Sequence, residues 1–170
     1  MDVHSFKIRL LMSSDLKETG RVIITALLPR LKKQGLSEND VKVITTRYSP
    51  ENMKQQVEGK CFFVAEDERK KILVGVGGLR KDDGSLVPNR LTTFYVLPIY
   101  QRMGIGQRLY EFLRNEAIKK GCKKLVVSSS PEAELFYKHL GFVKKRIDWK
   151  EFENGRKYYN VWMEKDLFVG

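Results

Sequence analysis

The sequence VLPIYQRMGIGQRL, residues 96–109, marks the change from a predicted strand to a predicted helix. The strand-like run 91–97 ends at Pro98, because proline cannot donate a hydrogen bond to a strand ladder. After two glycines, apolar residues recur at helical spacing on one face. The residues of this face are Ile105, Leu109, Phe112, Leu113 and Ala117. The segment therefore predicts a strand, a tight turn and the first turn of an amphipathic helix.

The start of this helix has the properties of an anion site. The first backbone N–H groups of a helix have no partner within it, and the helix dipole places positive charge there. Gly104 and Gly106 hold no side chain between these groups and a ligand. Arg102 adds a charge that can pair with phosphate through two hydrogen bonds. The sequence thus predicts a pyrophosphate cradle over Gln101–Gln107.

Other phosphate-binding motifs fit this segment less well. A dinucleotide-binding fold requires G-x-G-x-x-G, but Leu109 stands where the third glycine would be. The chain contains no G-x-x-x-x-G-K-[ST] run of the P-loop type. A surface turn with a glycine at a helix start remains the simpler alternative.

Length and composition favour one globular domain spanning residues 1–170. The chain has 42% hydrophobic and 31% charged residues, which is ordinary for a globular protein. It contains no run of eighteen apolar residues that would predict a membrane span. The first ten residues lack the apolar region of a signal peptide. We therefore expect a cytoplasmic protein that does not engage a membrane.

The net charge of +11 favours polyanionic ligands, such as coenzyme A or nucleic acid, although it also serves solubility. The sequence lacks the motifs of the common nucleic-acid-binding folds, so nucleic acid is not favoured. Cys61 and Cys122 stand far apart in apolar surroundings, which predicts two buried free thiols. With His4 and His139 they match no metal-ligand spacing, so we expect no bound metal.

The whole pattern predicts an α/β fold with a mixed, mostly antiparallel sheet of about seven strands flanked by helices. The expected strands are 6–11, 61–65, 72–79, 91–97, 123–128, 142–152 and 157–163. The expected helices run from Ser13 or Ser14 to Pro29, over 49–58, from the glycine turn to Gly121, and over 130–140.

Three details of this pattern stay open or suggest a special geometry. The polar segment Arg30–Thr46 has no assignment. The glycines 75, 77 and 78 suggest a bulge or the close approach of another backbone. Asn154-Gly155 is a strong signal for a hairpin turn between the last two strands.

Two blocks of this sequence resemble the GNAT superfamily of N-acetyltransferases. The first is Q-x-x-G-x-G at Gln101, Gly104 and Gly106, which is similar to the family's acyl-coenzyme A pyrophosphate motif. The second is A-x-x-F-Y-x-x-L-G-F over Ala133–Phe142. With the order of the strands, the resemblance extends over almost the full chain. It implies a GNAT-like fold and an N-acetyltransferase that uses acetyl-coenzyme A as co-substrate.

The resemblance also implies roles for single residues. Tyr137 stands where the family places its general acid, although an aromatic residue at helical spacing is also an ordinary core residue. Main-chain N–H groups of Phe94, Tyr95 and Val96 would polarise the acetyl carbonyl. The other expected cofactor contacts are Gln101, Arg102, Met103, Gly104, Ile105, Gly106, Gln107, Ser130 and Phe136. Ser130 departs from the family's usual asparagine, and a helix cap is the safer interpretation of it.

The sequence does not reveal a general base, so we expect a water relay or an amine that is already partly neutral. The expected reaction is direct transfer, because neither cysteine has the histidine partner of a nucleophile. The acceptor is an unidentified amine of a small molecule or a protein, and the basic surface disfavours polyamines. A homodimer is compatible with the sequence. The alternative from another class is a non-catalytic module that binds acyl-coenzyme A.

Overall fold

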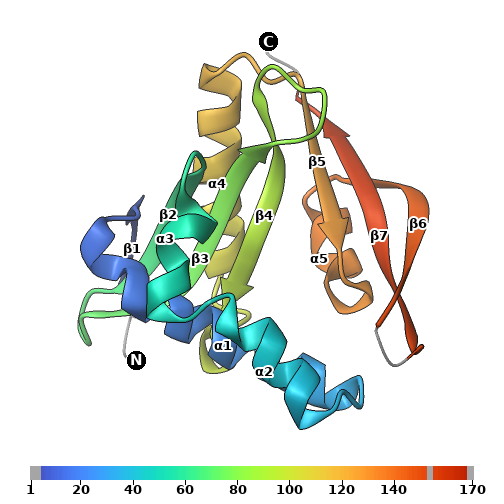
Figure 1. The fold of residues 1–170 in the computed structure, drawn as a ribbon. Helices are drawn as coiled ribbons and strands as arrows, with labels where there is room; N and C mark the ends of the chain where they lie inside the picture. Colours follow the sequence, from blue (N-terminus) through green and yellow to red (C-terminus); the bar gives the residue numbers. More distant parts are fainter. Residues whose placement is uncertain (1–4, 153–154, 168–170) are drawn as a thin grey trace. The chain divides into compact units, whose positions relative to one another are not determined.

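The structure is a computed structural model that describes residues 5–152 and 155–167. Seven strands are hydrogen-bonded in the order β1-β2-β3-β4-β5-β7-β6 (Figure 1), in an open, mostly antiparallel sheet. The strands are β1 (Phe6–Leu10), β2 (Cys61–Asp67), β3 (Ile72–Lys81), β4 (Pro88–Val96), β5 (Lys124–Ser129), β6 (Val143–Glu151) and β7 (Lys157–Asp166). The predicted α/β class and strand number are confirmed.

Five α-helices lie in the described part of the chain. They are α1 (Leu16–Lys33), α2 (Glu38–Thr46), α3 (Pro50–Val57), α4 (Ile105–Lys119) and α5 (Glu134–His139). Three short 3-10 helices precede α1, α4 and α5; they are η1 (Ser13–Asp15), η2 (Pro98–Tyr100) and η3 (Pro131–Ala133). Among the described residues, no helix is long and apolar enough to cross a membrane.

The chain divides into two compact units. Unit 1 consists of the described residues of Met1–Gly78 and Thr93–Leu113, and unit 2 of those of Leu79–Thr92 and Arg114–Gly170. Strands β3 and β4 and helix α4 run from one unit into the other. Each unit is described below by itself.

In unit 1, glycines on β3 make room for the side chains that cover this strand. A Cβ atom on Gly77 would lie 2.8 Å from the Leu113 side chain and 3.0 Å from the Phe94 ring. A Cβ atom on Gly78 would lie 2.7 Å from the Phe62 ring. The expected bulge or backbone approach is therefore wrong: β3 is one continuous strand, and side chains make the close approach.

The predicted apolar face of α4 is buried with one exception. Ile105, Leu109, Leu113 and Ala117 belong to the core. Phe112 is 42% exposed, although its ring contacts Phe63 at a centroid distance of 5.5 Å. It lies at the border of the apolar stripe, where helical spacing alone does not decide burial.

The first helix is longer than its proline predicts. Pro29 lies inside α1, which continues to Lys33. Proline removes one i→i−4 hydrogen bond from a helix, but Leu27 and Leu31 on either side of it are both buried in the core. We infer that this burial holds the helix together beyond Pro29.

The unassigned segment before residue 46 holds the helix α2. Its start is a capping box: the Ser37 hydroxyl accepts from the Asp40 N–H at 3.1 Å, and the Asp40 carboxylate accepts from the Ser37 N–H at 3.2 Å. The sequence signal for this start was the S-x-x-D spacing, which the weak apolar pattern of the segment obscured.

Gly20 on α1 provides a contact that no other residue allows. A Cβ atom there would lie 2.3 Å from the carbonyl oxygen of Tyr48. We expect Gly20→Ala to lower the free energy of unfolding by about 1–3 kcal/mol, because the Tyr48 backbone must move away from the helix. Urea unfolding of both proteins measures this. Equal stability would mean that the segment around Tyr48 shifts freely.

Unit 2 is built on the antiparallel strands β5, β7 and β6. Strand β4 pairs with β5 in parallel, with Arg90 opposite Val126. Strand β7 pairs with both β5 and β6, and a register shift interrupts β6 between Lys144 and Arg146. Of the predicted hairpin turn, Asn154 lies outside the described residues, and Gly155 has a positive φ of 79°.

Candidate functional site

The end of β4 contains a residue in an unusual backbone conformation. Thr93 has a φ of 49°, which is strained for a β-branched residue and frequent at functional sites. The strand irregularity that we expected at Phe94–Val96 therefore begins one residue earlier. The strand then ends with a hydrogen bond from the Leu97 N–H to the Val74 carbonyl on β3, at 2.9 Å.

The turn after β4 is anchored by Tyr100, which sequence reasoning did not single out. This side chain is 2% exposed, and its hydroxyl donates to the buried carboxylate of Asp67 at 3.1 Å. The Lys70 ammonium donates to the same hydroxyl at 3.0 Å. The N–H of Lys70 and the Tyr100 hydroxyl hold the pKa of Asp67 below its ordinary value despite burial. An ionised Asp67 thus fixes the start of the predicted cradle.

The predicted cradle forms an exposed loop that leads into α4. Arg102 and Gly104 both have left-handed backbones, with φ of 62° and 77°. The Gln101 side chain donates to the Val96 carbonyl at 3.2 Å, which ties the loop to the end of β4. The first hydrogen bond of α4 runs from the Arg108 N–H to the Gly104 carbonyl, at 3.1 Å.

This geometry leaves the loop accessible to a ligand. Residues 101–104 are exposed, and a Cβ atom on Gly104 would meet no atom within 4 Å. The N–H groups of Ile105, Gly106 and Gln107 precede the first intrahelical bond of α4, so they have no acceptor within the helix. Unit 1 therefore brings together ten predicted site residues. They are Phe94, Tyr95, Val96, Gln101, Arg102, Met103, Gly104, Ile105, Gly106 and Gln107.

The remaining predicted site residues lie in unit 2. Tyr137 is 5% exposed, and its ring packs between those of Phe136 and Phe142 at centroid distances of 5.2 Å and 5.6 Å. Ser130 is the N-cap residue of η3, but its side chain makes no capping hydrogen bond. Its carbonyl accepts instead from the Ala133 N–H at 3.1 Å. The expected side-chain cap is therefore wrong.

The cysteines differ from each other. Both are free, but only Cys122 is buried, whereas Cys61 is half-buried. Burial raises the pKa of the Cys122 thiol, which opposes a role as a nucleophile. In the described part of the chain, no group of three or more His, Cys, Asp or Glu side chains could hold a metal ion.

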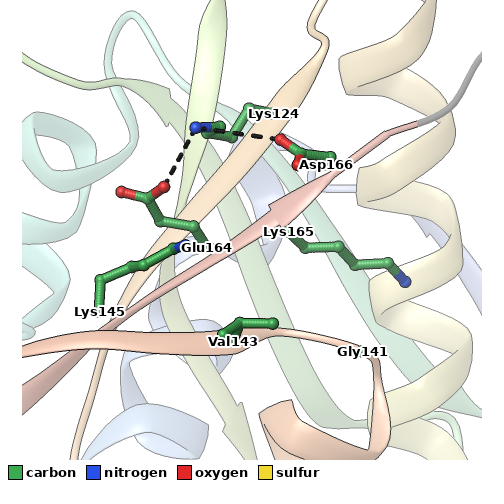
Figure 2. Close-up of a pocket in the computed structure, with 7 residues that line it drawn as sticks. All are labelled: Lys124, Gly141, Val143, Lys145, Glu164, Lys165 and Asp166. Carbon is green, nitrogen blue, oxygen red and sulfur yellow. Dashed lines mark hydrogen bonds and ion pairs between the residues drawn. The ribbon is translucent and has the colours of Figure 1, made fainter.

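A basic hollow in unit 2 was not predicted from the sequence (Figure 2). It is lined by Lys124, Gly141, Val143, Lys145, Glu164, Lys165 and Asp166. Lys124 forms ion pairs with Glu164 at 3.2 Å and with Asp166 at 3.9 Å. Lys165 donates to the Leu140 carbonyl. Since these two lysines have internal partners, the hollow offers little free positive charge to a ligand.

Comparisons with known proteins agree with this fold. The family model described as an acetyltransferase (GNAT) domain matches residues 27–167. The structure is similar to a GCN5-related N-acetyltransferase of Rhodopseudomonas palustris, with a TM-score of 0.79 and 21% identity, over 98% of this chain and 99% of that one. No curated protein sequence matches the chain.

Two further solved structures are similar over nearly their whole length. The PaiA N-acetyltransferase of Thermoplasma acidophilum, in complex with coenzyme A, has a TM-score of 0.71 and 20% identity, over 96% of this chain and 99% of that one. A GNAT-family acetyltransferase of Staphylococcus aureus has a TM-score of 0.69 and 17% identity, over 96% and 100%. At these identities the likeness concerns the fold.

Proposed function

This chain belongs to the GNAT family of acetyltransferases, and from that premise we propose that it transfers the acetyl group of acetyl-coenzyme A directly to a primary amine. The observation that carries the proposal is the exposed left-handed loop at Arg102–Gly104, which opens onto the first turn of α4. The coenzyme A complex of the T. acidophilum protein supports the choice of co-substrate. We further propose that residues 1–170 form a single acetyltransferase domain.

In this proposal the pyrophosphate of coenzyme A binds to the loop and to the start of α4. Backbone N–H groups of Ile105, Gly106 and Gln107 donate to phosphate oxygens, and the helix dipole favours their negative charge. Arg102 supplies a formal positive charge, and Gln101 and Met103 flank the bound group. Ser130 and Phe136 are proposed to contact the rest of the cofactor.

The reaction needs an electrophilic carbonyl and a neutral amine. Main-chain N–H groups in the segment Phe94–Val96 polarise the thioester carbonyl, and its position after the strained Thr93 supports this role. The amine nitrogen attacks the carbonyl carbon, and the carbonyl π electrons move to oxygen. When the tetrahedral intermediate collapses, the C–S bond breaks and the amide forms. The proton of the attacking amine leaves to water, since we assign no general base.

The departing thiolate needs a proton, and Tyr137 is proposed as its donor. An unperturbed thiol has a pKa of about 8.5 and a phenol about 10, so the transfer is modestly uphill and fast when the groups are in contact. The proton then returns to the phenolate from solvent. The tyrosine of the A-x-x-F-Y block supports this role through the family resemblance.

Thiol release tests the proposed function. We expect acetyl-coenzyme A with a panel of primary amines to release free thiol at a rate that depends on the amine, and calorimetry to detect coenzyme A binding. Coenzyme A binding with no amine-dependent release from any member of the panel would instead favour the non-catalytic module. Absence of both would reject the acetyl-coenzyme A assignment.

Arg102→Ala tests the contact to phosphate. We expect coenzyme A affinity to fall roughly 10- to 100-fold, because a charge-assisted hydrogen bond contributes about 1.5–3 kcal/mol. Pantetheine, which lacks the pyrophosphate, should bind equally to both proteins. Lys119→Ala at the exposed end of the same helix removes the same charge and serves as the control. Equal losses for coenzyme A and pantetheine would assign Arg102 to the solvated surface.

A further inference from the structure

The guanidinium of Arg30, near the end of α1, lacks a partner where most buried donors have one. The residue is half-buried, and within the described residues its Nε atom is buried without a hydrogen-bond acceptor. By contrast, Arg9 bonds to Asp15 at 2.6 Å, and Arg90 to Asp82 at 2.9 Å. Because an arginine stays charged in a protein and an unsatisfied buried donor is costly, this exception needs an explanation.

Two tyrosines from other segments of unit 1 lie beside this charge. Tyr95 comes from β4, and Tyr48 from the connection between α2 and α3; both are half-buried. Burial raises the pKa of Tyr95 to about 12, and Tyr48 raises it further through its charge and a hydrogen bond, while Arg30 opposes the shift. The Tyr95 hydroxyl therefore stays protonated at neutral pH and can donate. No acidic side chain in the described chain acts on it.

This cluster lies on the side of β4 away from α4. The Phe94 ring approaches Gly77 together with Leu113 of α4, and successive strand residues point to opposite faces. The Tyr95 side chain is thus directed to the other face, and Figure 1 draws α3 in front of the unit 1 strands and α4 behind them. Since Tyr95 belongs to the segment proposed to hold the acetyl carbonyl, the cluster adjoins the place where an acceptor must approach.

The position of Tyr48 is fixed by the helix that carries Arg30. Its carbonyl oxygen sits against Gly20 of α1, where even a Cβ atom would be only 2.3 Å away. This contact leaves the Tyr48 ring little freedom to move away from α1. The three side chains are therefore arranged by packing and not by exposed loops, which is typical of a preorganised binding site.

We infer that Arg30, Tyr48 and Tyr95 bind an oxyanion, a carboxylate or a phosphate, carried by the acceptor amine. The inference rests on the proposed function and specifies its substrate class. Guanidinium Nε–H and Nη–H groups form a fork that matches two oxygens of such a group, and phenol hydroxyls add further donors. An acceptor of this class is an amino acid or a phosphorylated amine, and a polyamine is excluded from the subsite by charge.

A binding experiment tests the subsite without any turnover. The Nε–H resonance of Arg30 in ¹⁵N-labelled protein is assigned by its loss in Arg30→Gln. N-acetylglycine, N-acetylphenylalanine, N-acetylglutamate and N-acetylphosphoethanolamine are titrated as probes, with N-ethylacetamide as the uncharged match. We expect at least one anionic probe to shift this resonance and N-ethylacetamide to leave it unchanged. No shift with any anionic probe, or an equal shift with N-ethylacetamide, overturns the inference.

A turnover experiment then measures selectivity. Each amino acid is compared with its decarboxylated amine, and phosphoethanolamine with ethanolamine, so that the two kinds of oxyanion are distinguished. We expect kcat/KM for the preferred anionic amine to fall roughly 10- to 100-fold in Arg30→Gln, which matches the loss of a charge-assisted contact. The rate with its uncharged match should stay unchanged. Arg30→Lys should recover part of the loss, because it keeps the charge but not the fork.

Control measurements separate this inference from the proposed function. Lys33→Gln removes an exposed charge from the last turn of the same helix, and we expect it to keep wild-type selectivity. Coenzyme A affinity should be equal in all these variants. Acetyl transfer that shows no preference for anionic amines would overturn the subsite and leave the function intact. A probe-dependent shift of Arg30 without coenzyme A binding would support the subsite and reject the function.

Discussion

Tyr137→Phe is expected to lower kcat by about 10²–10⁴-fold, which is the usual contribution of general acid catalysis. Only the hydroxyl is lost, so the ring should keep its packing between Phe136 and Phe142. The KM for acetyl-coenzyme A should change little, because proton donation to the thiolate occurs in the transition state and not in the bound ground state. Steady-state rates over a pH series, with a verified acceptor, measure the effect.

Tyr159→Phe provides the matched control for this variant. It removes one hydroxyl from a tyrosine of unit 2 whose ring packs on Trp149 at 5.1 Å, outside the proposed site. Both variants should unfold at nearly the wild-type urea concentration. Wild-type turnover of Tyr137→Phe across the pH series would mean that the residue serves packing alone, as its 5% exposure also permits.

The fold was predictable from local signals wherever those signals were strong. Pro98 ended the fourth strand, and Ser49-Pro50-Glu51 marked the start of α3 as observed. Pro29 misled because burial of its neighbours outweighs one lost hydrogen bond, a balance that depends on tertiary packing. The glycines of β3 were recognised as special, but the sequence could not tell that side chains from α4, β2 and β4 fill the space above them.

The candidate site was predictable only in part, for a similar reason. The Q-x-x-G-x-G spacing located the loop, because glycine is the residue that adopts its left-handed backbone most easily. The positive φ of Thr93 and Arg102 could not be predicted, since neither residue type favours it. Tyr100, Asp67 and the Arg30 cluster were missed because their contacts join residues that are distant in sequence.

Gly104→Val is expected to reduce coenzyme A affinity by at least about 100-fold, since two or more charge-assisted hydrogen bonds of about 1.5–3 kcal/mol each would be lost. Gly104 has a φ of 77°, which valine adopts only with strain. The loop must change its backbone to relieve that strain, and the N–H groups at the start of α4 then lose their common direction. Gly106→Val should act similarly by placing a branched side chain where the pyrophosphate approaches. Calorimetry with coenzyme A measures both variants.

Gly84→Val is a closely matched control for Gly104→Val. Gly84 has the same φ of 77°, and a Cβ atom on either glycine would meet nothing within 4 Å, so both substitutions bring the same backbone strain into open space. Gly84 lies in the turn between β3 and β4, away from the loop. Its variant should therefore lose similar stability and keep its coenzyme A affinity. If folded Gly104→Val also keeps that affinity, the cofactor phosphates do not bind at this loop, and the start of α4 is only a solvent-exposed turn.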